Sequence, residues 1–533
     1  SERGAELLDD HEASWRAELP DLTGIRWGAF RRGFVEAVEA RDAGTLLAQA
    51  KRIFAAAPVA EAWIQGADGL ADLARSAHLE RLRTVDLMSS EAGSEDIARL
   101  VRSPRIAGLR RLVLADNELG AATTEALACS RRLERLESLD LRQAWLDDDA
   151  AIALGRGRFP ALRELRLSKN GIGNGGVAAL ASLAPRLSRL DLSETAIGDP
   201  GLLALLAAPL ERLETLELDE CSELGEQAAT ALAQAELPAL SELKLNDLGF
   251  GAEGVRVLAS SPTLGKVRVL ALGGSELWGE PCRAFAASPH LGNLRVLELV
   301  SAELSYEDAR SLFASTSFPL LEELKLGFSG LADASALALA GSPVGKRLRT
   351  LHLIHCQVTA RGARALAGLG DLRTLRFGGN PIGDEGALTL LAEPCRLVEL
   401  DLNSTGITLP GLRKLLALPA VKRLRRLELC GDELGDEGAR LLAAAPNLSG
   451  LRSLWLSSDG IGDAGLTALA ASPHLGALRE LRLYNNRIGA AGARALAASP
   501  HLRNLREVDL RHNEVWAAGE ELGRRFGWGC RLQ

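Results

Sequence analysis

The sequence predicts an α/β solenoid, a fold that stacks one short strand–turn–helix unit many times along the chain. A pattern of three leucines recurs at near-constant spacing, a polar residue and a glycine follow it, and an alanine- and leucine-rich segment ends the unit. Residues 478–510 show the unit clearly, because the leucine pattern starts at Leu478 and starts again at Leu505. A repeat of this length that fills most of a chain is typical of a solenoid.

The second leucine of the pattern marks the register of each unit. It recurs seventeen times at spacings of 24 to 27 residues, and Ala62–Ile64 is a weaker eighteenth copy. The seventeen positions are Val85, Leu112, Leu139, Leu165, Leu190, Leu216, Leu243, Leu270, Leu297, Leu324, Leu351, Leu375, Leu400, Leu427, Leu454, Leu481 and Val508. A chain of 533 residues would otherwise suggest several globular domains, but the repeat predicts one continuous array instead.

The ninth position of the unit, here called the ladder position, is expected to turn inward and to bond backbone groups at the bend. Residues at this position that can form hydrogen bonds include Asn117, Asn170, Asn380, Asn486, Asn513, Cys221, Cys356, Thr195, Thr405, Ser275, Ser329, Asp432 and Asp459. Ala144, Leu248 and Ala302 cannot form such bonds, so we expect irregular turns there.

The residues that follow predict how each helix begins and ends. A glycine such as Gly462 or Gly489 suits a tight backbone at the start of the helix. Acidic pairs such as Asp436-Glu437 lie at the predicted helix starts, where they complement the helix dipole. Ser-Pro pairs such as Ser472-Pro473 end the helices, since proline cannot continue them.

The two ends depart from the repeat, which predicts a cap at 1–57, an array at 58–516 and a second cap at 517–533. In the first cap we expect helices over Glu2–Leu19 and Thr45–Ala57 and a strand at the end of Leu22–Val38, and Val59–Ile64 is strand-like. Residues 527–532 predict a final short edge strand.

The repeat pattern xLxLxxNxIGxxGAxxLA over about 58–515 resembles the ribonuclease-inhibitor type of leucine-rich repeat. This resemblance implies a horseshoe with a parallel sheet on its concave face and helices on its convex face. The N-terminal segment around Trp15, Trp27 and Phe34 resembles the segment before such repeats in bacterial proteins that carry the repeat-companion domain of myxobacteria and planctomycetes. A small helical domain precedes that segment in those proteins, so we expect the chain to be part of a longer one.

The composition of the chain argues against several kinds of partner and location. A formal net charge of −8 without a long basic cluster argues against nucleic acid as partner. No apolar run is long enough to span a membrane, and the start at Ser1 lacks a signal peptide. Seven irregularly spaced cysteines indicate free thiols in a reducing cytoplasm, and the preference for Arg and Ala suggests a bacterial source.

Three groups of outward-facing residues are candidates for binding. An acidic group, which is either a solvated face or steers a basic partner, consists of Asp191, Glu194, Glu217, Asp219, Glu220 and Glu242. A more apolar group consists of Val269, Val296, Val300, Phe328, Ile354, His352 and His355. The third group, Trp455, Arg482 and Tyr484, has residue types enriched in interface hot spots, although an ordinary exposed aromatic ladder is the alternative.

Catalytic motifs are absent from the sequence, so we expect no enzyme, no cofactor, no metal and no small-molecule substrate. The His352-x-x-His355-Cys356 cluster has metal-ligand residues, but the register turns Cys356 inward, away from the histidines. His290, His474 and His501 follow Ser-Pro pairs as part of the repeat.

Three functions remain. The first is a non-enzymatic scaffold that binds a protein partner on the concave face, through Val300, Phe328, His352, Ile354, Trp455, Arg482 and Tyr484. The second is the sensor part of a larger bacterial signalling or defence protein. The third is regulation of a small GTPase, which the resemblance allows because Ran GTPase-activating protein has repeats of this type.

Overall fold

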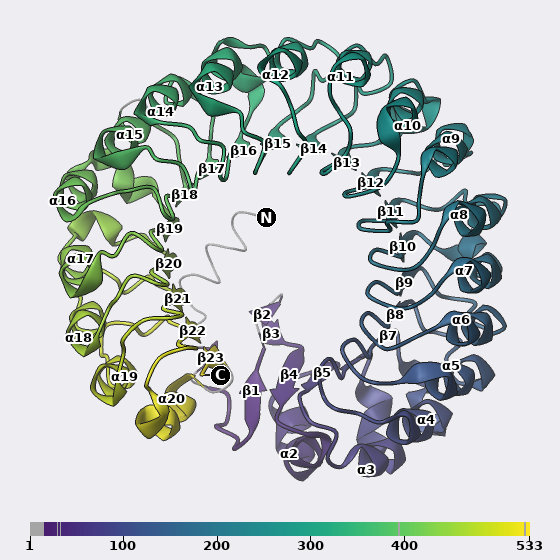
Figure 1. Ribbon diagram of the computed structural model, residues 1–533. Helices are drawn as coiled ribbons and strands as arrows, with labels where there is room; N and C mark the ends of the chain where they lie inside the picture. The colour runs from purple at the N-terminus through teal and green to yellow at the C-terminus, as the bar shows by residue number, and fades with distance from the viewer. Residues whose placement is uncertain are drawn as a thin grey trace. The chain divides into compact units, whose positions relative to one another are not determined.

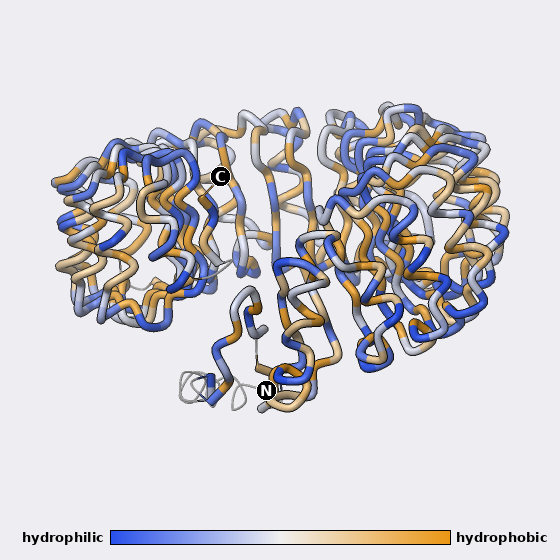
Figure 2. The backbone as a smooth tube through the Cα atoms, turned by 90° about the horizontal axis from the view of Figure 1, so that it is seen from below, coloured by the Kyte–Doolittle hydropathy of each residue, from blue (hydrophilic) through white to orange (hydrophobic). Residues whose placement is uncertain are grey.

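The computed structural model describes residues 15–16, 18–28, 30–31, 33–392, 395–526 and 529–532. The chain divides into two compact units, Ser1–Ala271 and Leu272–Gln533. In each unit the strands lie side by side on the inner side and the helices lie on the outer side (Figure 1). Apolar residues, orange in Figure 2, recur in every repeat of both units.

The first unit contains a sheet in which β4 to β13 pair in parallel in chain order, with β1 antiparallel to β4. Its strands are β1 (Ile25–Trp27), β2 (Phe30–Arg31), β3 (Phe34–Val35), β4 (Ala37–Ala40), β5 (Glu61–Ile64), β6 (Thr84–Asp86), β7 (Arg111–Val113), β8 (Ser138–Asp140), β9 (Glu164–Arg166), β10 (Arg189–Asp191), β11 (Thr215–Glu217), β12 (Glu242–Lys244) and β13 (Val269–Ala271). Its helices are α2 (Ala43–Ala56), α3 (Leu70–Arg75), α4 (Ser94–Arg102), α5 (Gly120–Cys129), α6 (Asp148–Gly155), α7 (Asn174–Leu180), α8 (Asp199–Leu206), α9 (Glu226–Gln234) and α10 (Gly251–Ala259).

The second unit repeats this arrangement, and β14 to β23 pair in parallel in chain order. Its strands are β14 (Val296–Glu298), β15 (Glu323–Lys325), β16 (Thr350–His352), β17 (Thr374–Arg376), β18 (Glu399–Asp401), β19 (Arg426–Glu428), β20 (Ser453–Trp455), β21 (Glu480–Arg482), β22 (Glu507–Asp509) and β23 (Cys530–Arg531). Its helices are α11 (Glu280–Ala286), α12 (Tyr306–Phe313), α13 (Ala332–Gly341), α14 (Ala360–Leu366), α15 (Gly383–Leu390), α16 (Leu409–Ala417), α17 (Gly435–Ala443), α18 (Asp463–Ala470), α19 (Ala490–Ala497) and α20 (Gly519–Phe526).

The predicted register is confirmed. Each of the seventeen second leucines is the central residue of a three-residue strand and is buried. Within a unit it pairs with its equivalent in the next strand, as Leu454 does with Leu481. The third leucine, for example Leu483, is also buried, so outward positions alternate with core positions along the strand.

A left-handed residue just before the ladder position bends the chain out of each strand. This turn position has a φ between 51° and 79° in all seventeen repeats, for example 54° at Asn485 and 56° at Phe328. The bend turns the next residue inward, where the ladder forms. Asn486 accepts hydrogen bonds at Oδ1 from the N–H groups of Asp459 (3.1 Å) and Ile461 (3.0 Å). Its amide nitrogen donates to the carbonyl oxygens at Leu456 (2.8 Å) and Leu483 (3.0 Å).

The expectation of irregular turns at Ala144, Leu248 and Ala302 is wrong. The turn residues that precede them have ordinary φ values for this position, 51° at Gln143, 56° at Asp247 and 59° at Ser301. At Ala144, which has no polar side chain, the backbone carbonyl oxygen accepts the N–H of Leu119 in the preceding repeat at 3.3 Å, and Asn170 Oδ1 accepts the N–H of Ala144 at 3.0 Å.

The helices are also capped by neighbouring repeats. Asp436 Oδ1 accepts the N–H groups of Gly462 (2.7 Å) and Gly465 (2.9 Å), which begin the helix of the next repeat. The acidic residues at helix starts therefore bind specific N–H groups of the following repeat in addition to complementing the dipole. Gly462 has an extended backbone with φ −105°, so a tight turn is not the reason for glycine there. At Gly465 a Cβ would lie 2.6 Å from Asp436 Oδ1, and this contact excludes a side chain.

The serines of the Ser-Pro pairs form hydrogen bonds to the end of the helix in the preceding repeat. The hydroxyls of Ser472 and Ser499 donate to the carbonyl oxygens of Ala443 and Ala470, each at 2.5 Å. These carbonyls end α17 and α18, so the serine satisfies acceptors that the helix leaves unpaired.

The ends of the chain contain several predicted elements. Helix α2 covers the predicted Thr45–Ala57 helix, β4 and β5 lie where strands are expected, and β23 is the final short strand. Most of the predicted Glu2–Leu19 helix lies outside the described residues. Residues 527–528 of the predicted last strand also lie outside them. The cap boundaries at 57 and 517 remain predictions. Among the described residues, no helix has the length and apolar character needed to cross a membrane.

Asp459 provides a pH-dependent test of the ladder. Its Oδ1 accepts the N–H of Asp432 at 3.1 Å, but its Oδ2, which replaces the amide nitrogen of asparagine, is buried without a hydrogen-bond partner. Burial, with Asp432 nearby, raises the pKa of Asp459 from 3.8 to about 7. The folded state therefore favours the neutral acid, and the resulting stability is complete below pH 3.8 and is lost as the pH rises through about 7.

We expect Asp459→Asn, which cannot ionise, to gain stability relative to the native protein as the pH rises from about 5 to about 8. Urea unfolding midpoints at several pH values measure this difference. The exposed Asp247→Asn is the control and should show no such trend. A difference between native protein and Asp459→Asn that does not change with pH would contradict the protonated ladder.

The ladder cysteines should resist labelling in the native protein. Cys356 Sγ donates to the carbonyl oxygen of Leu326 at 2.9 Å, and burial raises the pKa of its thiol to about 11. Cys221 is also buried, whereas Cys129 is exposed. A maleimide should modify Cys129 quickly and should reach Cys221 and Cys356 only after unfolding, as measured by peptide mass spectrometry. Rapid labelling of both ladder cysteines would show that the register is wrong.

Candidate functional site

The sheet face of the second unit contains the seven residues predicted to bind a partner. They form two groups. The middle patch consists of Val300, Phe328, His352 and Ile354, to which we add His355, and the C-terminal patch consists of Trp455, Arg482 and Tyr484. Four strand spacings of about 4.8 Å separate β16 from β20, so the patches are on the order of 19 Å apart. Val296 also lies in this unit, whereas Val269 belongs to β13 of the first unit.

The middle patch has at its centre a position without a side chain, Gly327, and we call the space above it the depression. Gly327 lies between Val300 and Ile354 on successive repeats and has no side chain to fill the space above it. A Cβ at Gly327 would lie 3.8 Å from Val300 Cγ1 and 3.7 Å from Ile354 Cβ. Both neighbours are half-buried and Gly327 is buried, so two apolar side chains flank the depression.

Phe328 forms one side of this depression and occupies an unusual position. It is a turn residue with φ 56°, its side chain is 58% exposed, and its ring stacks on His355 with centroids 4.9 Å apart. The other sixteen turn positions hold polar residues or glycine. A bulky residue at positive φ costs backbone energy, and an exposed ring adds no burial, so the fold does not require Phe328.

His352 adds a neutral polar group to the patch. Burial, together with the positive charges of Lys325 and Arg376, lowers its pKa from 6.5 to about 4. The imidazole is therefore uncharged at neutral pH.

The C-terminal patch is built around Trp455, which is half-buried. The guanidinium carbon of Arg482 lies 3.8 Å from the indole centroid, and that of Arg426 lies 5.1 Å away. These arginines come from β21 and β19, the strands on either side of β20. The indole therefore already forms cation–π contacts within the chain and is less available to a partner than its residue type suggests.

Glu480 holds this group in place. It accepts hydrogen bonds from Ser453 Oγ at 2.6 Å and from Arg482 Nε at 2.7 Å. Burial alone raises the pKa of Glu480, but these bonds, the charge of Arg482 and the Trp455 side chain lower it below its usual value. The carboxylate is ionised at neutral pH and fixes the Arg482 side chain beside Trp455.

Tyr484 is the more accessible aromatic residue of the C-terminal patch, with 37% of its surface exposed. Its ring meets the edge of His512 at a centroid distance of 4.8 Å, and the guanidinium carbon of Arg511 lies 5.6 Å from its centroid. Asp509 binds Arg511 through two hydrogen bonds of 2.9 and 2.6 Å. The ring is thus supported on one side and open on the other.

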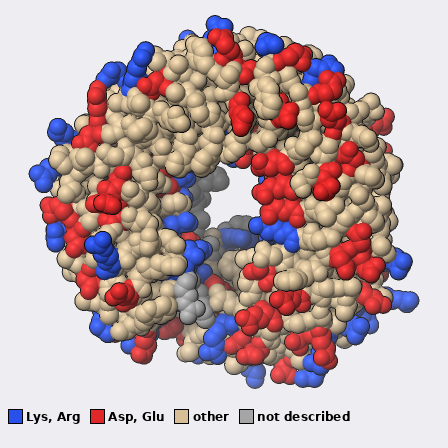
Figure 3. Space-filling view, viewed as in Figure 1, with Lys and Arg blue, Asp and Glu red and all other residues tan. Residues whose placement is uncertain are grey.

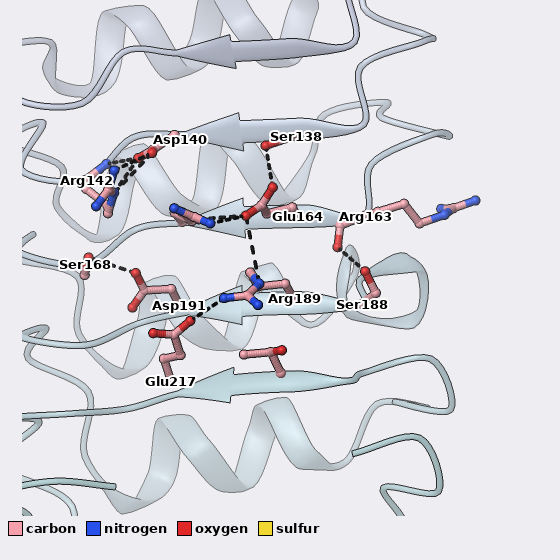
Figure 4. Close-up of polar contacts among 12 residues, drawn as sticks. Ser138, Asp140, Arg142, Arg163, Glu164, Ser168, Ser188, Arg189, Asp191 and Glu217 are labelled. Atoms are coloured by element: carbon pink, nitrogen blue, oxygen red, sulfur yellow. Dashed lines mark hydrogen bonds and ion pairs between the residues drawn. The ribbon is translucent and has the colours of Figure 1, made fainter. Parts of the chain in front are cut away.

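The acidic group of the first unit is largely neutralised within the chain (Figure 4). Glu217 forms ion pairs with Arg189 (2.9 Å) and Lys244 (2.8 Å). Asp191 is buried and accepts a hydrogen bond from Ser168 Oγ at 3.0 Å. Figure 3 shows a group of acidic side chains, in red, on the inner side of this unit. The internal partners favour the interpretation of this group as a paired polar face.

The His352–His355–Cys356 cluster does not converge. Cys356 points into the core, while His355 is exposed and stacks on Phe328. Within the described ranges, no three residues of the kinds that bind metals come together.

Three contributors to the patches were absent from the sequence prediction. Gly327 creates the depression, Arg426 adds the second cation beside Trp455, and His512 supports Tyr484. The register places each beside a predicted residue on a neighbouring repeat, so comparison of equivalent positions would have found them.

Comparison with known proteins supports the fold. A family model described as "Leucine Rich repeat" matches residues 160–181, 186–206, 348–367, 371–391 and 478–497. The ribonuclease inhibitor of Sus scrofa is 36% identical over 122 residues, which cover 21% of this chain and 26% of that protein. The matched part thus spans about a quarter of this relative's length.

Solved structures resemble the chain at low identity. The TLR13–ssRNA13 complex has a TM-score of 0.46 at 18% identity and covers 81% of this chain and 60% of the other. The Rad7–Elc1 complex of yeast gives 0.44 at 19%, covering 64% and 79%. The ectodomain of the receptor kinase GASSHO1/SCHENGEN3 from Arabidopsis thaliana gives 0.30 at 15%, covering 85% and 64%. Similarity at this level carries no information about function. From its repeats and its strand–helix units, the chain is a leucine-rich-repeat protein, and each of its two units is an α/β solenoid.

Proposed function

We propose that the chain is a non-enzymatic interaction scaffold whose second unit binds a protein partner on its sheet face. The observation that carries the proposal is the exposure of Phe328 and Tyr484 at positions where the repeat requires no aromatic residue. Exposed aromatic side chains beside an apolar depression are typical of the centre of protein interfaces.

A protein partner is favoured over nucleic acid by the charge of the C-terminal patch. Three arginines in or beside the patch lie among three carboxylates, namely Arg426, Arg482 and Arg511 with Glu428, Glu480 and Asp509. Phosphate backbones bind surfaces with an excess of cations, and this patch has none.

Two alternatives remain predictions, the sensor part of a larger bacterial protein and a regulator of a small GTPase. The contacts of the two patches favour neither. A cytoplasmic location also remains a prediction. It rests on the cysteines, and the buried cysteines of the ladder are free thiols.

Truncation of the exposed rings should weaken capture of the partner. We expect Phe328→Asn and Tyr484→Ala each to reduce recovery of a stoichiometric partner from a lysate of the source organism about tenfold, or roughly 1.4 kcal/mol. Asparagine tolerates the positive φ of residue 328, so this change should spare the turn. Quantitative mass spectrometry of nuclease-treated pull-downs of the full chain measures the recovery.

Tyr306→Ala is the matched control for these variants. Tyr306 is the other tyrosine of the chain, is 46% exposed and lies at the start of α12, away from the sheet face. Equal recovery with all three variants would reject the site. A partner released by nuclease would reject the choice of protein over nucleic acid.

Gly327→Ala tests the depression separately. The added Cβ makes only ordinary contacts of 3.5 Å or more, so the free energy of unfolding should change by less than about 0.5 kcal/mol. The methyl group fills the space between Val300 and Ile354, and we expect weaker partner binding in the same pull-down. Unchanged binding with unchanged stability would remove the depression from the interface.

A further inference from the structure

A second surface of the second unit carries an unusual concentration of positive charge. It is an open depression of about 550 Å³ at the edge of the sheet where the chain enters β17 to β19. Five cationic side chains line it, namely Arg373, Arg396, Lys422, Arg423 and Arg425. All five residues are exposed to solvent.

The repeat register brings these residues together. Arg373, Val398 and Arg425 each precede the first residue of a strand, and they are joined by backbone hydrogen bonds from Val398 N to Arg373 O and from Arg425 N to Val398 O, both 2.7 Å. Lys422 and Arg423 lie on the 3-10 helix Pro419–Arg423, just before Arg425. The short side chain of Val398 between two arginines leaves the depression open.

Equivalent positions elsewhere in the chain show why the charge is not neutralised here. Where an arginine is followed one repeat later by a glutamate, the two pair, as Arg110 does with Glu137 at 2.5 Å and Arg295 with Glu322 at 3.2 Å. Val398 takes the place of such a glutamate, so this position supplies no carboxylate to Arg373 and Arg425 on either side.

The charge balance stays positive when nearby carboxylates are counted. Asp371 pairs with Arg396 at 3.0 Å. Glu393 follows in the sequence but lies outside the described residues, and we count it as a full negative charge. Five cations less two anions leave +3 at this depression, in a chain whose net charge is −8.

Arg425 is held by backbone oxygens. Its Nη1 donates to the carbonyl oxygens of Lys422 and Leu424, both at 3.3 Å. These contacts orient the guanidinium without cancelling its charge, and a guanidinium has further donors for a ligand. Planar guanidinium groups match the geometry of phosphate oxygens.

We propose that this basic depression is a binding site for a compact anion with several phosphate groups. The volume falls within the range of small-molecule sites, roughly 300 to 1,000 Å³, and the cationic lining suits a multiply charged ligand. The site lies at the strand-entry edge, on different residues from the middle and C-terminal patches. If no such anion binds at this depression, the proposed protein interface is therefore unaffected.

Isothermal titration of the full chain with inorganic tripolyphosphate tests the site. We expect saturable binding that weakens with added salt, and we expect Arg373→Ala/Arg425→Ala to weaken it at least tenfold. Arg110→Ala is the matched control, since it removes an arginine from the equivalent position of another repeat, and it should change the affinity less than about twofold. Lys422→Ala, an exposed change, should weaken binding in the same direction and serves if the double variant unfolds.

Two further ligands show which kind of anion the depression binds. Sulfate at equal ionic strength should bind much more weakly, because it carries less charge per molecule. Equal binding of sulfate, or unchanged binding by both the Arg373→Ala/Arg425→Ala and Lys422→Ala variants, would overturn the site. Tighter binding of a short single-stranded oligonucleotide that the same variants abolish would replace the small anion with nucleic acid and would also overturn the proposal.

Discussion

The hydrogen bonds at the ladder position hold consecutive repeats together, and the rest of each unit depends on them. A left-handed residue bends the chain after every strand and would leave backbone groups unpaired in the interior. Asn380 shows how they are satisfied. Its Oδ1 accepts the N–H groups of Cys356 and Val358, and its amide nitrogen donates to the carbonyl oxygen of Leu353 in the preceding repeat and to that of Phe377 in its own.

The ends of the helices also form hydrogen bonds with side chains of neighbouring repeats. Aspartates such as Asp463 bond the first N–H groups of the next helix, and serines such as Ser499 bond the last carbonyls of the previous one. Each repeat thus completes the one before it, and these ladder and capping bonds join adjacent repeats. A substitution in the ladder is therefore expected to act locally. At Asp459, whose Oδ2 lacks a hydrogen-bond partner, the strands on either side keep their register.

The outward positions are free of these requirements, and there the repeats differ chemically. The second unit presents exposed aromatic residues on its sheet face and a cluster of arginines and lysine at the strand-entry edge. The first unit presents carboxylates that are mostly paired with arginine, lysine or serine of adjacent strands. Neighbouring charges on a sheet neutralise each other when opposite charges alternate. They do not alternate at these two surfaces, because the repeats on either side of Gly327 carry Val300 and Ile354 at the same position, and those on either side of Val398 carry Arg373 and Arg425.

The sequence by itself determined the number of repeats, their register and the residues that turn inward, because the leucine period reports burial directly. It also identified the seven residues of the two patches as outward-facing. Only the tertiary structure decided how available they are. Trp455 is covered by Arg426 and Arg482, Phe328 adopts a left-handed backbone, and Arg373 and Arg425 line one depression although about fifty residues separate them. These features depend on contacts between side chains one or two repeats apart, and such contacts are set by the bend of each turn and by side-chain rotamers, which a sequence period does not encode.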